Sequence, residues 1–131
     1  MNNYFDKVKS YLLEMDLSIL LEDEADGVIV VSNEEDGINN LVLGIADPLL
    51  IVEQFLVELK NPSADDYKHL LQKNRDIVHG SFVIDDSGSK VIFRDTLQLE
   101  NLDLNEIEAS FNSLSLLLNE YSEELIKLSG N

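Results

Sequence analysis

Residues 63–103 read SADDYKHLLQKNRDIVHGSFVIDDSGSKVIFRDTLQLENLD, and this stretch decides the fold. Ser63, with Asp66 three positions later, predicts a capping box that opens a helix. Two β-forming runs follow at residues 81–85 and 90–99, and the Asp-Ser-Gly sequence between them predicts a tight turn. The stretch therefore predicts a helix followed by a β-hairpin, which is one half of an α+β arrangement.

The spacing of apolar residues in this stretch indicates which side chains are buried. We expect the helix to end near Asn74, with three residues pointing inward: Tyr67, Leu70 and Leu71. In the hairpin, alternation predicts that the inward residues are Phe82 and Ile84 on one strand and Val91 and Phe93 on the other. Both elements would then face one core.

The C-terminal helix has the strongest pattern in the chain. Asp103 and Glu106 form a capping-box pair at its start, and Ser129-Gly130 ends it. Its apolar residues follow at alternating spacings of four and three: Ile107, Phe111, Leu114, Leu118, Tyr121, Leu125 and Leu128. Leu116 and Leu117 make this seam wider than a coiled coil requires. The seam is therefore either buried against the domain's own sheet or partly exposed for a partner.

The N-terminal half predicts one more helix and a series of strands. A helix of about three turns begins at Tyr4. Turn signals of the Asp-Gly type follow, and they bound strands at residues 28–31 and 38–46. The short apolar run of residues 17–21 precedes these strands.

Residues 49–59 fit either a helix or a strand, and the β-forming side chains after Pro48 favour a strand. On that strand five residues would share one face: Leu49, Ile51, Phe55, Val57 and Leu59. The predicted order is α-β-β-β(-β)-α-β-β-α. This order is typical of an α+β fold with helices packed over one antiparallel sheet.

Length and charge bound the function. The 131 residues predict a single domain that spans 1–131. Twenty-six acidic residues against nine basic ones give a formal net charge of −17, which disfavours nucleic acids and anionic membranes and favours basic partners or cations. The chain has no cysteine, which excludes disulfides and zinc–thiolate sites. Without a signal-peptide pattern at the N-terminus, we expect a cytoplasmic protein.

No motif in the sequence points to a reaction. The two histidines, His69 and His79, stand in no zinc-protease pattern, and no serine stands in a nucleophile motif. Phosphate-binding and dinucleotide-binding glycine patterns are also lacking. The sequence therefore predicts a protein that is not an enzyme, with no catalytic residue, no metal site and no cofactor.

Two groups of carboxylates flank the first two turns, and they leave alternatives open. They comprise Glu22, Asp23, Glu24 and Asp26 at the first turn and Glu34, Glu35 and Asp36 at the second. Their spacing does not match an EF-hand loop. They are either solvated tips, a docking surface for a basic partner, or the ligand-rich tips of a calcium-binding or sensory regulatory protein.

The order of elements and three local patterns resemble a known family. Leu70-Leu71 followed by Asn74 is similar to its middle-helix pattern LL..N. Residues 80–85, GSFVID, resemble its strand pattern g.f.ld, and LQLENLD at 97–103 falls where the family has L…gLd before the last helix. The chain in these respects resembles the class I type III secretion chaperones (Tir-chaperone-like proteins) and the bacterial sensory-transduction-regulator (YbjN-like) family that shares their fold. One departure is that residues 38–59 read as two strands where the family has one.

The resemblance implies an intracellular, non-enzymatic protein, often a homodimer, that holds an extended segment of a client protein along apolar grooves. The candidate dimer residues that it implies are Tyr67, Leu70 and Leu71. The candidate client contacts lie in the first strands: Leu17, Ile19, Leu21, Val28 and Val30. Because proteins without a secretion role share this fold, the resemblance does not identify a client.

Overall fold

The computed structural model describes residues 3–130, and its elements follow the predicted order. The helices are α1 (Tyr4–Glu14), α2 (Ala64–Asn74) and α3 (Leu104–Leu128). The strands are β1 (Ser18–Asp23), β2 (Val28–Asn33), β3 (Ile38–Ala46), β4 (Leu49–Glu58), β5 (Ser81–Ile84) and β6 (Lys90–Gln98). A short 3-10 helix, η1 (Glu34–Asp36), joins β2 to β3. The α+β class is confirmed, and residues 49–58 form the favoured strand.

The strands form one antiparallel sheet in the order β1-β2-β3-β4-β6-β5. The first four strands are successive neighbours, and the β3–β4 hairpin turns at a cis Asp47-Pro48 peptide. Strand β6 pairs with β4 along nearly its whole length and brings β5 to the far side. The two edges of the sheet are therefore β1 and β5.

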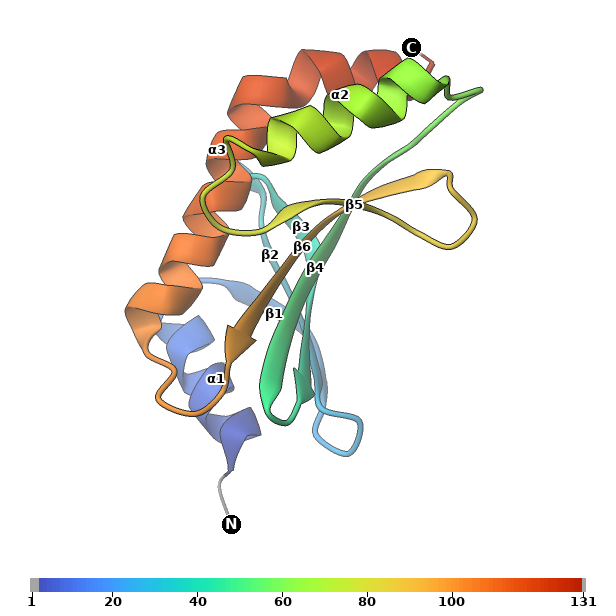
Figure 1. Ribbon diagram of the computed structural model, residues 1–131. Coiled ribbons are helices and arrows are strands. Elements are labelled where there is room, and N and C mark those ends of the chain that lie inside the picture. The colour runs from blue at the N-terminus through green and yellow to red at the C-terminus, as the bar shows by residue number, and fades with distance from the viewer. Residues whose placement is uncertain (1–2, 131) are drawn as a thin grey trace.

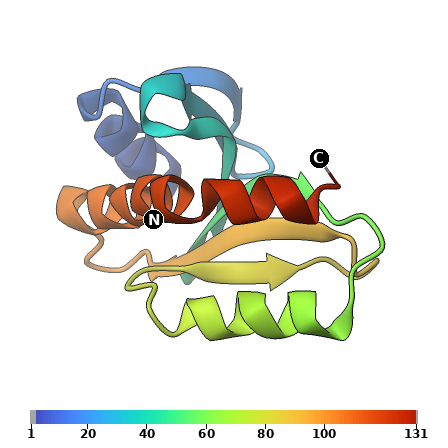
Figure 2. The same cartoon turned by 90° about the horizontal axis from the view of Figure 1, so that it is seen from above.

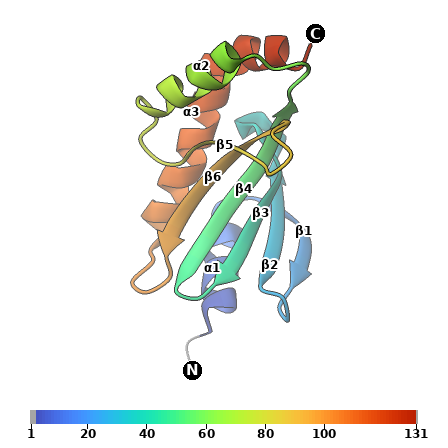
Figure 3. The ribbon, with the colours of Figure 1, turned by 45° about the vertical axis from the view of Figure 1, so that its right-hand side comes forward.

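The helices lie on one side of this sheet and at one of its edges. Helices α1 and α3 pack on the same face, as Figure 1 shows, and both contribute to the core. Helix α2 lies alongside the β5 edge and next to the C-terminal half of α3 (Figure 2). Figure 3 looks toward the opposite face of the sheet, which no helix of the described residues covers.

The core lies between the sheet and helices α1 and α3. In the sheet, fully buried residues stand opposite one another across strands, as in the pairs Ile29–Leu43 and Val31–Leu41. The apolar residues that α3 buries are Ile107, Phe111, Leu114, Leu117, Tyr121 and Leu125. Most of the predicted seam is thus covered by the chain's own sheet, which removes most of its apolar area from water. Leu118 is half-buried and packs against the core, Leu117 beside it is buried, and Leu116 remains 68% exposed.

The structure corrects one expectation about α2. Ser63 and Asp66 form both bonds of the predicted capping box, and Leu70 is buried. Leu71, which was expected to point inward, is 70% exposed. Helix α2 borders an edge strand instead of covering a sheet face, so only a narrow stripe of it is buried, and the next residue along the helix turns away by about 100°.

A second expectation, one shared face along residues 49–59, is correct only for the first part of β4. The register of β4 shifts between Phe55 and Val57, which marks a bulge. Phe55 lies on the uncovered side of the sheet, whereas Val57 packs against the core and Leu59 is buried. An extra residue in a strand reverses the alternation of side chains beyond it, so the five residues cannot share one face.

Candidate protein-binding surface

The face of the sheet opposite α1 and α3 carries a broad set of apolar side chains, which we name the open face. In β2, β3 and β4, the fully buried residues alternate with these side chains, because successive strand residues point to opposite faces. The apolar residues of the open face are Leu21, Val28, Val30, Val42, Leu49, Ile51, Phe55, Val83 and Ile92. Phe55 is 53% exposed and Leu21 is 49% exposed. Apolar groups gathered on one uncovered face are typical of a binding surface.

One row of residues crosses the open face from edge to edge. Leu21 stands opposite Val30, and Val30 stands opposite Val42. The row continues with Glu53 and Arg94, whose side chains form an ion pair with 3.1 Å between Oε1 and Nη1. Along this row, the apolar residues lie nearest β1, and a charge pair occupies the positions on β4 and β6.

The two edges of the sheet also differ in whether their outer backbone groups have partners. At β5, the Asn74 side chain of α2 binds both the N–H and the C=O of Phe82, at 2.7 and 3.1 Å. At β1, no strand of the described residues pairs with the outer side. A strand edge with available backbone groups can accept another extended chain. The unpaired β1 edge thus lies next to the apolar residues Leu21, Val30 and Val42 of the open face.

The predicted client residues fall into two groups. Leu21, Val28 and Val30 come together on the open face, with Leu21 and Val30 directly paired. Leu17 is buried at 8% exposure, and Ile19 stands opposite the buried Val31 and packs against the core. The β1 bulge at Leu20, between Ile19 and Leu21, separates the two groups.

Several residues of the open face were not among the predicted contacts. Val42, Ile51 and Phe55 belong to it because β3 and β4 bury the alternate residues, including Leu50 and Val52. The period-two pattern of these strands was visible in the sequence. It did not reveal which of two apolar faces the helices would cover.

The residues predicted for a dimer interface occupy different positions on α2. Leu70 points into the molecule, and Tyr67 is half-buried with its hydroxyl donating to the Gly88 carbonyl oxygen at 2.7 Å. Leu71 is the exposed member of the three. The contact of these residues with a second copy stays a prediction.

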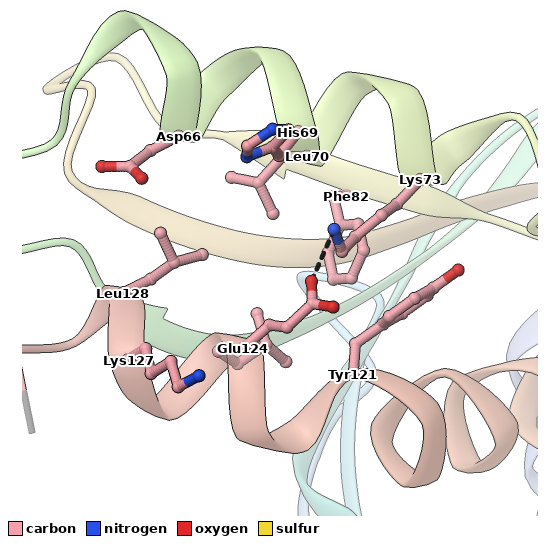
Figure 4. Close-up of a pocket in the computed structure, with 10 residues that line it drawn as sticks. Asp66, His69, Leu70, Lys73, Phe82, Tyr121, Glu124, Lys127 and Leu128 are labelled. Atoms are coloured by element: carbon pink, nitrogen blue, oxygen red, sulfur yellow. Dashed lines mark ion pairs between the residues drawn. The ribbon is translucent and has the colours of Figure 1, made fainter.

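A pocket of about 430 Å³ lies between α2 and the C-terminal half of α3 (Figure 4). Its apolar lining comes from Leu70, Phe82, Leu125 and Leu128. Across its opening, the Lys73 Nζ atom lies 2.5 Å from a Glu124 carboxylate oxygen. The same Nζ atom lies 5.4 Å from the centroid of the Tyr121 ring. Burial raises the pKa of the Tyr121 hydroxyl, with the neighbouring acid Glu120 acting in the same direction. The ion pair of Lys73 with Glu124 and the contact of Lys73 with the Tyr121 ring bind α2 to α3.

The acidic turns do not assemble into a cation site. Within residues 3–130, no three His, Asp or Glu side chains gather in an arrangement that could hold a metal ion. The two acidic groups lie at opposite ends of β2, because one precedes that strand and η1 follows it. In the part of the chain that the structure describes, no helix has the length and apolar character to cross a bilayer.

Comparison with solved structures shows the same architecture in several proteins. YbjN from E. coli has a TM-score of 0.72 and 12% sequence identity, covering 92% of each chain. The structure of the HopA1–SchA chaperone–effector complex matches with a TM-score of 0.63 and 12% identity, covering 98% of this chain and 96% of that one. The Yersinia pestis type III secretion chaperone SycH, solved with a fragment of YscM2, matches with a TM-score of 0.54 and 16% identity over 96% and 99%. These likenesses show that the chain shares its fold with YbjN and with type III secretion chaperones of known structure.

Sequence comparisons complete the assignment. A search of curated proteins finds no match. The family model CesT_Tir_1 matches residues 1–131. The chain therefore belongs to the CesT_Tir_1 family.

Proposed function

We propose that this protein is a non-catalytic chaperone that works in the cytoplasm and holds an extended segment of a client protein. The observation that carries the proposal is the position of the apolar part of the open face beside the accessible β1 edge. A client strand laid there gains main-chain hydrogen bonds from the edge and pockets for alternate side chains from the face. The structural relatives support the proposal, because two of them were solved together with a bound protein partner.

Leu21 and Val30, paired across β1 and β2, are the residues that we assign first to client contact. Val28 and Val42 extend the same surface along β2 and across to β3. Leu17 and Ile19 would contribute indirectly, because they hold β1 against the core. The net charge of −17 would keep a complex with an apolar client in solution.

We also propose that the protein forms a homodimer through α2. The exposed Leu71 is the anchor of that contact, and Tyr67 lies one turn before it on the helix. Leu70 supports the interface indirectly, because it fixes α2 against Phe82 and α3. The single domain of residues 1–131 would be the unit that dimerises.

A photocrosslinking experiment in native cells tests the client proposal. A photoreactive amino acid placed at Leu21 or Val42 should yield one discrete crosslinked protein, because both side chains lie on the open face. The same amino acid at Leu116 or Ile126 of α3 serves as the control, since these side chains are at least as exposed, at 68% and 53%.

Binding of the purified partner then separates contact from proximity. The double substitution Leu21→Lys with Val42→Lys should abolish binding, whereas Leu116→Lys with Ile126→Lys should leave it intact. Both pairs add the same charge to exposed positions, so a general charge effect would weaken binding equally. Equal crosslinking from both surfaces, or equal loss of binding in both pairs, would contradict the proposal.

A further inference from the structure

The open face ends, near η1, in a wide hollow of about 820 Å³. Its acidic residues are Asp16, Glu34 and Glu35, and all three are exposed. Asn39 and Asn40 add side-chain amides to its lining, and Leu20, which is 55% exposed, supplies an apolar wall. Ser18 of β1 and Ser32 of β2 belong to the same lining, so the hollow lies directly at the end of the β1 edge.

The hollow has a negative charge that the chain itself does not neutralise. The ion pairs among the described residues are Lys9–Glu22, Lys73–Glu124 and Arg94–Glu53, and none of them involves a residue of the hollow. No lysine or arginine lines it. Because these carboxylates are exposed and line one hollow that has no basic side chain, they attract a cationic group.

The walls of the hollow are held in place from beneath. The buried Gln54 side chain accepts from the Asn39 N–H and donates to the Gly37 carbonyl oxygen, each at 3.0 Å. The Ser115 hydroxyl of α3 donates to the Asp36 carbonyl oxygen. Gly37 has a φ of +76°, and a Cβ there would meet the Leu118 side chain at 2.8 Å. A preformed site of this kind binds with a smaller entropy cost than a mobile loop.

We propose that the client segment carries an arginine or lysine next to its apolar residues, and that this basic side chain occupies the hollow while the apolar residues lie on the open face. This inference rests on the proposed function and names the chemistry of its partner. The guanidinium of an arginine offers five donors to carboxylates and amide oxygens, and its aliphatic stem would lie against Leu20.

The opposite end of the open face also carries exposed acidic residues. Glu24 and Asp26, in the turn that leads into β2, are exposed, and β2 separates them from η1 by about 17 Å at roughly 3.3 Å per residue. A segment with a basic residue at each end and alternating apolar residues between them would match the whole strip. A second copy of this chain fits poorly, because face-to-face contact would bring like charges together.

Three synthetic peptides test the inference against the unmodified protein. All three have blocked termini and the same central sequence of alternating valine and threonine. They differ only in the residue at each end, which is arginine, glutamine or glutamate. At low ionic strength we expect the arginine-ended peptide to bind about tenfold more tightly than the glutamine-ended one, with a smaller ratio at about 0.5 M salt. The glutamate-ended peptide should bind most weakly.

Charge-matched variants locate the effect. Glu34→Gln with Glu35→Gln should remove most of the preference for arginine ends, whereas Glu120→Gln with Glu123→Gln on α3 should keep it. Equal binding of the arginine-ended and glutamine-ended peptides would overturn the inference and leave the proposed function standing. An equal loss of preference in both variants would also overturn it, because that outcome reports general charge attraction. If none of the peptides binds, the open face is not a peptide surface, and both proposals fail.

Discussion

Asn74 and Phe82 form a closed pair of hydrogen bonds between the last residue of α2 and the edge strand β5. The Phe82 N–H donates to the Asn74 side-chain oxygen at 2.7 Å, and the Asn74 amide donates to the Phe82 carbonyl oxygen at 3.1 Å. Both backbone groups point away from β6, so the asparagine satisfies the outer side of the sheet as a neighbouring strand would. This pair makes the two edges of the sheet unequal.

Replacing Asn74 should therefore destabilise the whole fold. Asn74→Ala removes both bonds and leaves the Phe82 backbone groups without these partners, and we expect a loss of about 2 kcal/mol in the free energy of unfolding. Urea denaturation measures this loss. Asn119→Ala, at an exposed site on α3, is the matched control and should be neutral or slightly stabilising. A similar midpoint for the Asn74 variant and the unmodified protein would show that these bonds contribute little.

Gln54 is the buried polar side chain that holds η1, and its loss should act locally. Gln54→Leu leaves the Asn39 N–H and the Gly37 carbonyl without their partner, so we expect a loss of about 1–3 kcal/mol and faster amide exchange around η1. Hydrogen–deuterium exchange with urea denaturation measures both effects. Gln98→Leu, on the exposed side of β6, controls for the change in residue type. Unchanged exchange at residues 34–40 would show that other contacts are enough to hold η1.

Leu71 provides a test of the proposed dimer that does not disturb the core. Because its side chain is 70% exposed, Leu71→Asp should leave the monomer folded and should convert a dimer into a monomer in light scattering. Leu116→Asp, at 68% exposure on α3, should not. Leu70 is unsuitable for this purpose, because a charge at a buried position would unfold the protein. A dimer that persists in the Leu71 variant and dissociates in the Leu116 variant would move the interface to α3.

Asp85 should make the stability of the β5–β6 hairpin depend on pH. Its carboxylate accepts from the Lys90 N–H at 3.0 Å, the Ser89 N–H at 3.2 Å and the Ser87 hydroxyl at 2.9 Å. The backbone bond from Lys90 is the main cause that lowers the pKa of this carboxyl, with the Ser87 and Ser89 bonds acting in the same direction. A carboxyl whose pKa falls on folding stabilises the folded state above its ordinary pKa, and the contribution is lost as pH falls through the lowered value.

Asp85→Asn should accordingly be less stable than the unmodified protein near neutral pH. The difference should begin to shrink as the pH falls below about 4, the ordinary pKa of an aspartate, because the unfolded chain binds the proton there first, and it should disappear once the pH falls below the lowered pKa of the folded state. Urea midpoints measured across this range, with Asp86→Asn as the exposed neighbouring control, test the sign. A difference that stays constant with pH would show that the charge of Asp85 is irrelevant.

The sequence by itself determined the elements and their order. The capping box of Ser63 and Asp66, the hairpin of β5 and β6 and the seam of α3 were all predictable, because each depends on residues a few positions apart. Local hydrogen bonds and side-chain periodicity carry that information in the sequence. Motifs and net charge can also be read directly from the sequence. The lack of a catalytic motif and the excess of acidic residues favoured a binding function over a reaction.

Only the tertiary structure decided which surfaces were left uncovered. Both faces of β4 carry apolar residues, and the pairing of β4 with β6 together with the packing of α1 and α3 selected Leu50 and Val52 for the core. The exposure of Leu71 likewise follows from the position of α2 at an edge. The hollow at η1 joins side chains from β1, β2 and β3 that strand pairing brings together. Such pairing depends on contacts between distant residues, and their register cannot be read from the local pattern of any one strand.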